Sequence, residues 1–73
     1  MDPQATWQLL LDAYSDGNSH EAREAAENLL AWLEKRGFPP QVLPDRPMDE
    51  AWNRELAHEV CQFVMRRCDS PFV

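Results

Sequence analysis

Four side chains that could do chemistry lie along one side of a predicted C-terminal helix. His58, Cys61, Met65 and Cys68 follow one another at spacings of three, four and three residues. Imidazole, thiolate and thioether groups bind soft metals, and a thiol beside an imidazole is the pair that thiol catalysis uses. A helix rises ~1.5 Å per residue, so positions 58 and 68 lie about 15 Å apart and cannot share one ion. The acidic residues near Cys61 also disfavour the negatively charged thiolate that a reactive cysteine needs.

These observations predict no enzymatic activity, no bound metal and no cofactor. Cys61 and Cys68 are then expected to be small buried apolar side chains, which is how free cysteines usually occur. A redox or metal-responsive regulator that uses Cys61, Cys68 and His58 is the second of two alternative functions.

The two cysteines also bear on location. Seven residues of helix separate their Cα atoms by about 10 Å, beyond the ~7 Å that a disulfide spans, so an internal disulfide is excluded. Reduced thiols suit the cytosol. Residues 1–5 carry no basic charge, and no apolar run is long enough for a signal peptide or a membrane span. We therefore expect a cytoplasmic protein.

Length and charge limit the class of protein and of partner. The chain has 73 residues, which is enough for one domain, and its 44% hydrophobic and 27% charged residues are typical of a globular protein. Thirteen acidic against seven basic residues give a formal net charge of −6. This charge repels phosphate backbones and anionic lipids, so we expect neither nucleic acid nor a membrane as partner.

Apolar periodicity predicts an all-α domain of three helices, a helical hairpin followed by a third helix, over residues 1–73 as a single domain. Trp7, Leu10 and Tyr14 lie on one face of a first helix over about residues 3–15. A stripe of alanine and leucine marks a second helix over about 19–36, which Gly37 is expected to end. A third helix is expected over about 48–67, followed by a short tail over 68–73.

The connector over residues 38–47 holds four of the six prolines and is expected to be extended and stiff. At ~3.1 Å per residue in polyproline geometry it would reach roughly 30 Å, about the length of the second helix. The third helix could therefore begin beside the start of the second helix and run parallel to it.

The third helix has an unusually wide apolar arc. Trp52, Leu56, Phe63 and their neighbours fill about 140° of it, and Cys61, Met65 and Cys68 extend it to about 220°. Either this helix is central and packs on both other helices, or one flank is an interface. Trp32, at the edge of the stripe on the second helix, is expected to be partly exposed and suits a binding rim. The predicted interaction surface therefore consists of Trp32, Cys61, Met65 and Cys68.

The helical hairpin over residues 5–37 resembles a single degenerate tetratricopeptide repeat. Trp7, Leu10 and Tyr14 match the first-helix pattern of that family, whereas Leu11 replaces a small residue. Residues 17–22 resemble its inter-helix turn, and Ala22 and Ala26 occupy the small positions of its second helix.

The spacing from Tyr14 to Ala22 is one residue short of the family pattern, and the closing prolines, Pro39 and Pro40, come late. The resemblance implies peptide or protein binding, with the third helix covering the open face of the repeat. No ligand-binding residue of the family is carried over.

Together these observations predict a small, non-enzymatic protein–protein interaction module with an acidic surface and a protein or peptide as partner. The first alternative is a homodimeric structural or assembly protein that uses the face of the third helix on itself.

Overall fold

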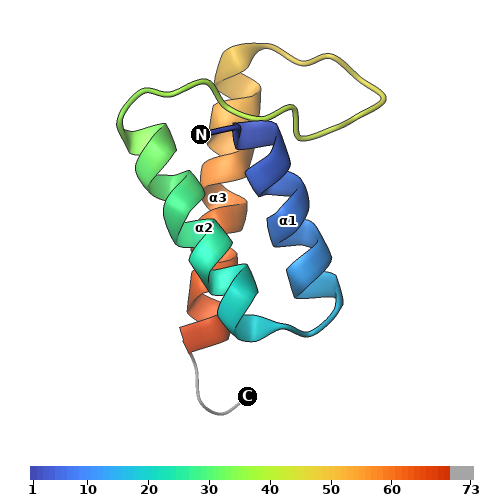
Figure 1. The fold of residues 1–73 in the computed structure, drawn as a ribbon. Helices are drawn as coiled ribbons and strands as arrows, with labels where there is room; N and C mark the ends of the chain where they lie inside the picture. The colour runs from blue at the N-terminus through green and yellow to red at the C-terminus, as the bar shows by residue number, and fades with distance from the viewer. Residues whose placement is uncertain (70–73) are drawn as a thin grey trace.

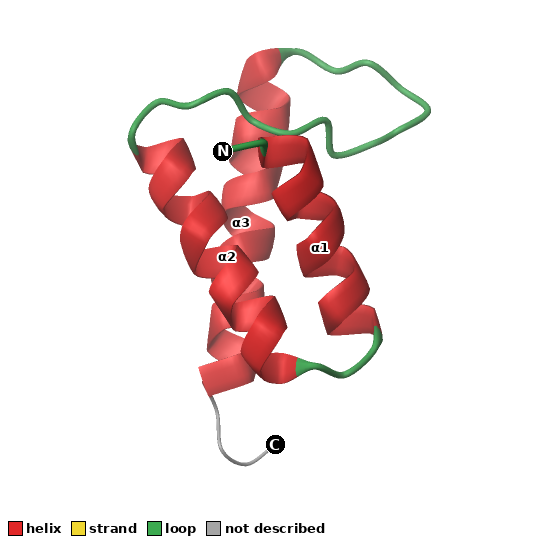
Figure 2. Ribbon diagram, in the orientation of Figure 1, coloured by secondary structure: helices red, strands yellow, loops and turns green. Residues whose placement is uncertain are grey.

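The chain folds into three α-helices, which confirms the predicted all-α class (Figures 1 and 2). The computed structural model describes residues 1–69. Helix α1 spans Pro3–Ser15, α2 spans Ser19–Glu34 and α3 spans Glu50–Asp69. The predicted tail is shorter than expected at its start, because residues 68 and 69 belong to α3, and the rest of it lies outside the described residues.

Helix α1 begins at a side-chain cap. The Asp2 carboxylate accepts hydrogen bonds from the backbone N–H groups of Gln4 at 3.0 Å and Ala5 at 3.2 Å, and Pro3 takes the first helical position. At the other end Gly17 adopts a φ of +79°. The Gly17 and Asn18 N–H groups donate to the Tyr14 and Ala13 carbonyls, which closes the last turn as a Schellman motif.

Helix α2 begins at a capping box. The Asn18 side-chain oxygen accepts from the Glu21 N–H at 3.2 Å, and the Asn18 amide donates to the Glu21 carboxylate at 3.1 Å. The helix ends at Glu34, earlier than the predicted residue 36, because Arg36 takes the left-handed conformation with a φ of 69°. Arg36, rather than Gly37, is therefore the residue that ends the helix.

Helix α3 runs antiparallel to α2 (Figure 1), so the parallel course that the reach of the connector would allow is not the one adopted. The Arg54 guanidinium in the first turns of α3 donates to the Leu33 carbonyl in the last turn of α2, at 3.1 Å. Helix α3 starts at Glu50 rather than near residue 48, because Asp49 is its N-cap and accepts from the Trp52 N–H at 2.7 Å.

The connector stays at one end of the bundle and does not run along the bundle axis. It crosses from α2 to the start of α1, then swings outward and returns to α3 (Figure 1). Gln4 and the Gln41 backbone exchange two hydrogen bonds, at 2.8 and 3.2 Å, and a turn between Leu43 and Arg46 reverses the chain. An extended segment that bends back in this way delivers α3 to the same end of the bundle at which α2 stops.

The core is centred on α2, so the alternative in which α3 is the central helix is wrong. Helix α2 packs against both α1 and α3. Small side chains let the helices approach closely. The buried apolar residues are Trp7, Leu10, Ala13, Ala22, Ala25, Ala26, Leu29, Leu33, Ala57, Cys61 and Val64.

One polar side chain is buried with this core. The Asn53 amide oxygen accepts from the Val42 N–H at 3.2 Å, and its amide nitrogen donates to the Met48 carbonyl at 3.2 Å. Asn53 thereby attaches both ends of the returning loop to α3. Within residues 1–69, each helix is too short or too polar to cross a lipid bilayer.

Candidate interaction surface

One flank of α3 that the sequence pattern favours as core is open to solvent. Phe63 is 43% exposed, and Trp52 and Leu56, on the same side of the helix, are only partly buried. The buried line runs instead through Asn53, Ala57, Cys61 and Val64. Because α3 packs chiefly on α2, only the stripe that faces α2 is covered.

Helix α1 extends this open flank. Leu11 and Tyr14 are each 38% exposed. The Tyr14 ring lies edge-on to Phe63, with 6.1 Å between ring centroids and 61° between ring planes. Two helices therefore join in one apolar surface, which we call the α1/α3 strip and define as Leu11, Tyr14, Trp52, Leu56 and Phe63.

Charged groups at the two ends of the strip differ in sign. Asp49 precedes Trp52 by one helical turn and is exposed. At the other end the Arg67 guanidinium lies over the Phe63 ring, 5.9 Å from its centroid. Between them Glu59, also exposed, lies on the same side of α3 as Leu56 and Phe63.

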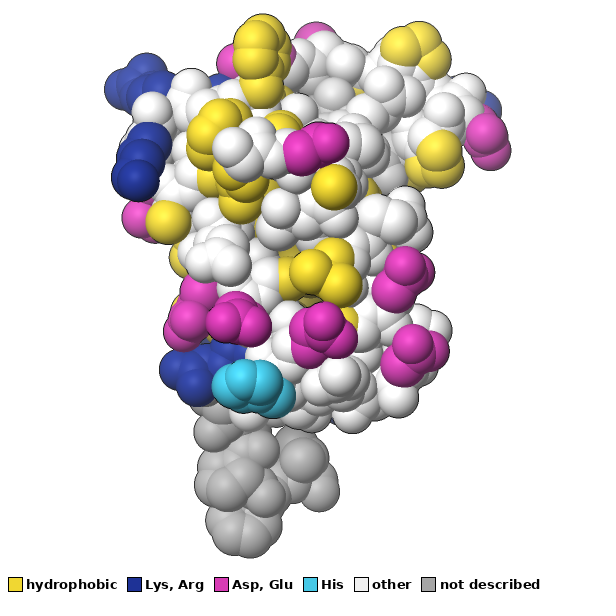
Figure 3. All heavy atoms as spheres, in the orientation of Figure 1, with side chains coloured by type: hydrophobic (Ala, Val, Ile, Leu, Met, Phe, Trp, Pro, Cys, Tyr) yellow, Lys and Arg dark blue, Asp and Glu magenta, His cyan; other side chains and the backbone are white. Residues whose placement is uncertain are grey.

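The face formed by α1 and α2 has a different character. Asp and Glu side chains are spread over its middle and lower parts, whereas apolar side chains gather at the end where the connector crosses (Figure 3). Phe38, in that connector, is 72% exposed. The face formed by α1 and α2 is therefore acidic over much of its area, whereas the α1/α3 strip combines aromatic side chains from two helices.

The four residues predicted as an interaction surface do not form one. Cys61 is fully buried, so the prediction is wrong at that position. Trp32, Met65 and Cys68 are partly exposed but line three different grooves. Trp32 lies between α1 and α2, Met65 between α2 and α3, and Cys68 beside the turn that joins α1 to α2.

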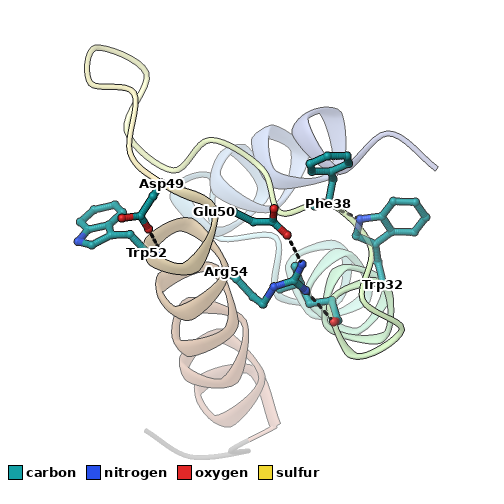
Figure 4. A network of polar contacts seen from close by, with 7 residues as sticks. Trp32, Phe38, Asp49, Glu50, Trp52 and Arg54 are labelled. Carbon is teal, nitrogen blue, oxygen red and sulfur yellow. Dashed lines mark hydrogen bonds and ion pairs between the residues drawn. The ribbon is translucent and has the colours of Figure 1, made fainter.

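Trp32 has a contact that its sequence position does not indicate. Its indole N–H donates to the Phe38 carbonyl at 2.7 Å (Figure 4). The ring also lies so close to Gly37 that a Cβ at position 37 would clash with it. The partial exposure expected for Trp32 is therefore accompanied by a role in holding the connector against the end of α2.

Cys61, the candidate nucleophile, is a buried thiol. Burial raises the pKa of Cys61 from 9.0 to about 12. His58, three residues earlier, is partly exposed and lines the groove between α2 and α3. Within residues 1–69, no three His, Cys, Asp or Glu side chains are placed to hold a metal ion.

We expect the two thiols to react at very different rates. Since a thiol reagent attacks the thiolate, a pKa raised from 9.0 to about 12 lowers the reactive fraction of Cys61 at neutral pH about a thousandfold. The variant Cys68→Ser should therefore resist labelling in native buffer and label fully in denaturant, whereas Cys61→Ser should label readily. Native Cys61 reacting as fast as free cysteine would contradict the burial and restore the redox alternative.

A groove lined mostly by charged side chains has Arg54 at its centre, and this cation is engaged. It measures about 680 Å³ and lies between the end of α2 and the first half of α3. Arg54 in this groove donates to the Leu33 carbonyl and also pairs with Glu50 at 2.9 Å (Figure 4). These bonds fasten α3 to α2, so the groove is best explained as part of the fold.

The sequence contained a signal for the α1/α3 strip, namely the excess width of the apolar arc on α3. The sequence did not show which edge of the arc would stay uncovered, because that depends on where α2 packs. Comparison with protein-family models, with curated proteins and with solved structures finds no match to this chain.

Proposed function

We propose that this chain is a non-enzymatic protein-interaction module that binds a partner protein through the α1/α3 strip. The observation that carries the proposal is the Tyr14–Phe63 pair, two aromatic side chains in edge-on contact that stay 38% and 43% exposed on neighbouring helices. Exposed aromatic side chains on a small domain are the kind of residue that contributes most at interfaces.

The strip is also organised before binding. All five of its residues lie on α1 and α3, and none lies on the connector. A partner would therefore meet a surface whose backbone is already ordered, which reduces the entropy cost of association. The resemblance of the α1–α2 hairpin to a tetratricopeptide repeat supports the same class of function, protein or peptide binding.

Charge favours a protein partner over nucleic acid or an anionic membrane. The net charge of −6 would repel phosphate groups from the whole molecule. We place this module in the cytoplasm, where its two unpaired cysteines would remain reduced. The regulator that would use Cys61 and His58 has less support, because the thiol is buried and its pKa is raised.

The proposal is tested by photo-crosslinking from the strip. A benzophenone side chain at position 63, in extracts of the cells that produce the protein, should give a discrete crosslinked product that contains this chain. Position 9 is the matched control, because Leu9 is 44% exposed against 43% for Phe63 but lies on the other side of α1 from Leu11. It should give at least tenfold less product.

Equal products from positions 63 and 9 would show nonspecific capture, and no product from position 63 would show that the strip has no partner. Either result would overturn the proposed function.

A further inference from the structure

We propose that the α1/α3 strip is covered by a second copy of this chain, with the two α3 helices antiparallel. The inference rests on the proposed function, since it identifies the occupant of the same surface. Three features of α3 carry it: the charges at the ends of the strip, the order of its apolar residues, and Glu59 near its centre.

The end charges complement one another when α3 is reversed. Asp49 and Arg67 lie on the strip side of the helix, about nine residues before and after position 58, or roughly 13 Å along the axis. An antiparallel copy centred on position 58 places Asp49 of each chain opposite Arg67 of the other. A parallel copy would instead place each of these charges opposite its own kind.

The apolar residues keep their register in the same arrangement. With position 58 as the centre, Trp52 of one copy lies within one residue of Phe63 of the other along the helix axis, and Leu56 lies opposite Val60. Trp52, Leu56 and Val60 are partly buried and Phe63 is 43% exposed, so each has surface left to bury. A twofold axis thus makes the strip complementary to itself, as closed homodimers require.

Glu59 sets the strength of the association. It lies one residue past the centre, so the Glu59 carboxylates of the two copies would lie near the axis and repel each other. The strip also consists of five residues, far fewer than the roughly 20–30 per side of a standard interface. We therefore infer a weak, reversible dimer that dissociates at low micromolar concentrations of chain.

Sedimentation velocity with reductant, from about 1 µM to 1 mM chain, tests the proposal. The unaltered protein should shift from monomer to dimer over this range. Phe63→Asp should remain monomeric, whereas Leu9→Asp, which changes an equally exposed leucine off the strip, should dimerise like the unaltered protein. Circular dichroism establishes that both variants are folded.

Two charge variants should move the dissociation constant in opposite directions. Glu59→Gln removes the repulsion at the axis and should tighten the dimer about fivefold, whereas Arg67→Glu should weaken it about tenfold. Both positions are exposed, so neither change should affect folding. A dimer that Glu59→Gln weakens would have a different geometry and would overturn the antiparallel arrangement.

The sedimentation and crosslinking results together distinguish failure of this inference from failure of the proposed function. A protein that stays monomeric up to 1 mM overturns the second copy as occupant. If position 63 then crosslinks to a different protein, the proposed function holds and its occupant is a heterologous partner. If position 63 crosslinks to nothing, both fail.

Discussion

Replacing Leu29 by alanine is expected to lower the free energy of unfolding by about 3–4 kcal/mol. Leu29 is fully buried on α2, the helix that packs against both others, so its removal leaves a cavity that few neighbours can fill. A chain of 73 residues has a total stability of roughly 4–11 kcal/mol, so the variant would be close to unfolding. Urea denaturation followed by circular dichroism measures the loss.

Leu9→Ala is the matched control for this prediction. It removes the same atoms from a side chain that is 44% exposed, and it should cost less than about 1 kcal/mol. Similar losses at both positions would mean that Leu29 is not at the centre of the core.

Gly37→Ala is expected to destabilise the protein by about 2–3 kcal/mol, an unusually large effect for adding one methyl group in a connector. The new Cβ would clash with the Trp32 indole, and the hydrogen bond from this ring to the Phe38 carbonyl keeps it in place. Either the Trp32 indole ring must rotate away from position 37, or the backbone of the connector must shift. Thermal or urea unfolding, compared with the unaltered protein, measures the cost.

A double-mutant cycle tests this mechanism. Once Trp32→Ala has removed the ring, adding Gly37→Ala should cost almost nothing, so the two losses should not add. Gly17→Ala is the control: it strains a left-handed residue with a φ of +79°, but no atom lies within 4 Å of its Cβ position. The loss of stability caused by Gly17→Ala should be the same with and without Trp32→Ala. Additive losses for Gly37 and Trp32 would rule out the clash.

The local features of the fold could be predicted because each depends on a few neighbouring residues. The caps at Asp2 and Asn18, for example, are hydrogen bonds between residues two and three positions apart. The three helices follow the apolar periodicity, with errors of a turn or less at their ends. Gly37 shows the limit of this local reasoning. The residue that ends α2 is Arg36, and glycine is required at position 37 because the ring of Trp32, five positions earlier, leaves no room for a Cβ.

The packing of α3 could not be predicted, because two arrangements satisfy its apolar arc. Periodicity gives the centre and width of an arc, but the face that becomes buried is chosen by the helix that packs against it. The length of the connector set only its maximum reach. The hydrogen bonds between Gln4 and Gln41 hold the connector at one end of the bundle, so this reach is not used. The direction of α3 and the exposed flank at Phe63 both follow from these distant contacts.

The up-and-down order of the helices also has a kinetic consequence. Helix α2 meets α1 through a tight turn and α3 through one connector, so most of the packing joins segments that are adjacent in the chain. Bringing such segments together costs little loop-closure entropy, which is the property of domains that fold within microseconds to milliseconds. The apolar face of α2 that packs on α3 should therefore be covered soon after α3 has been synthesised.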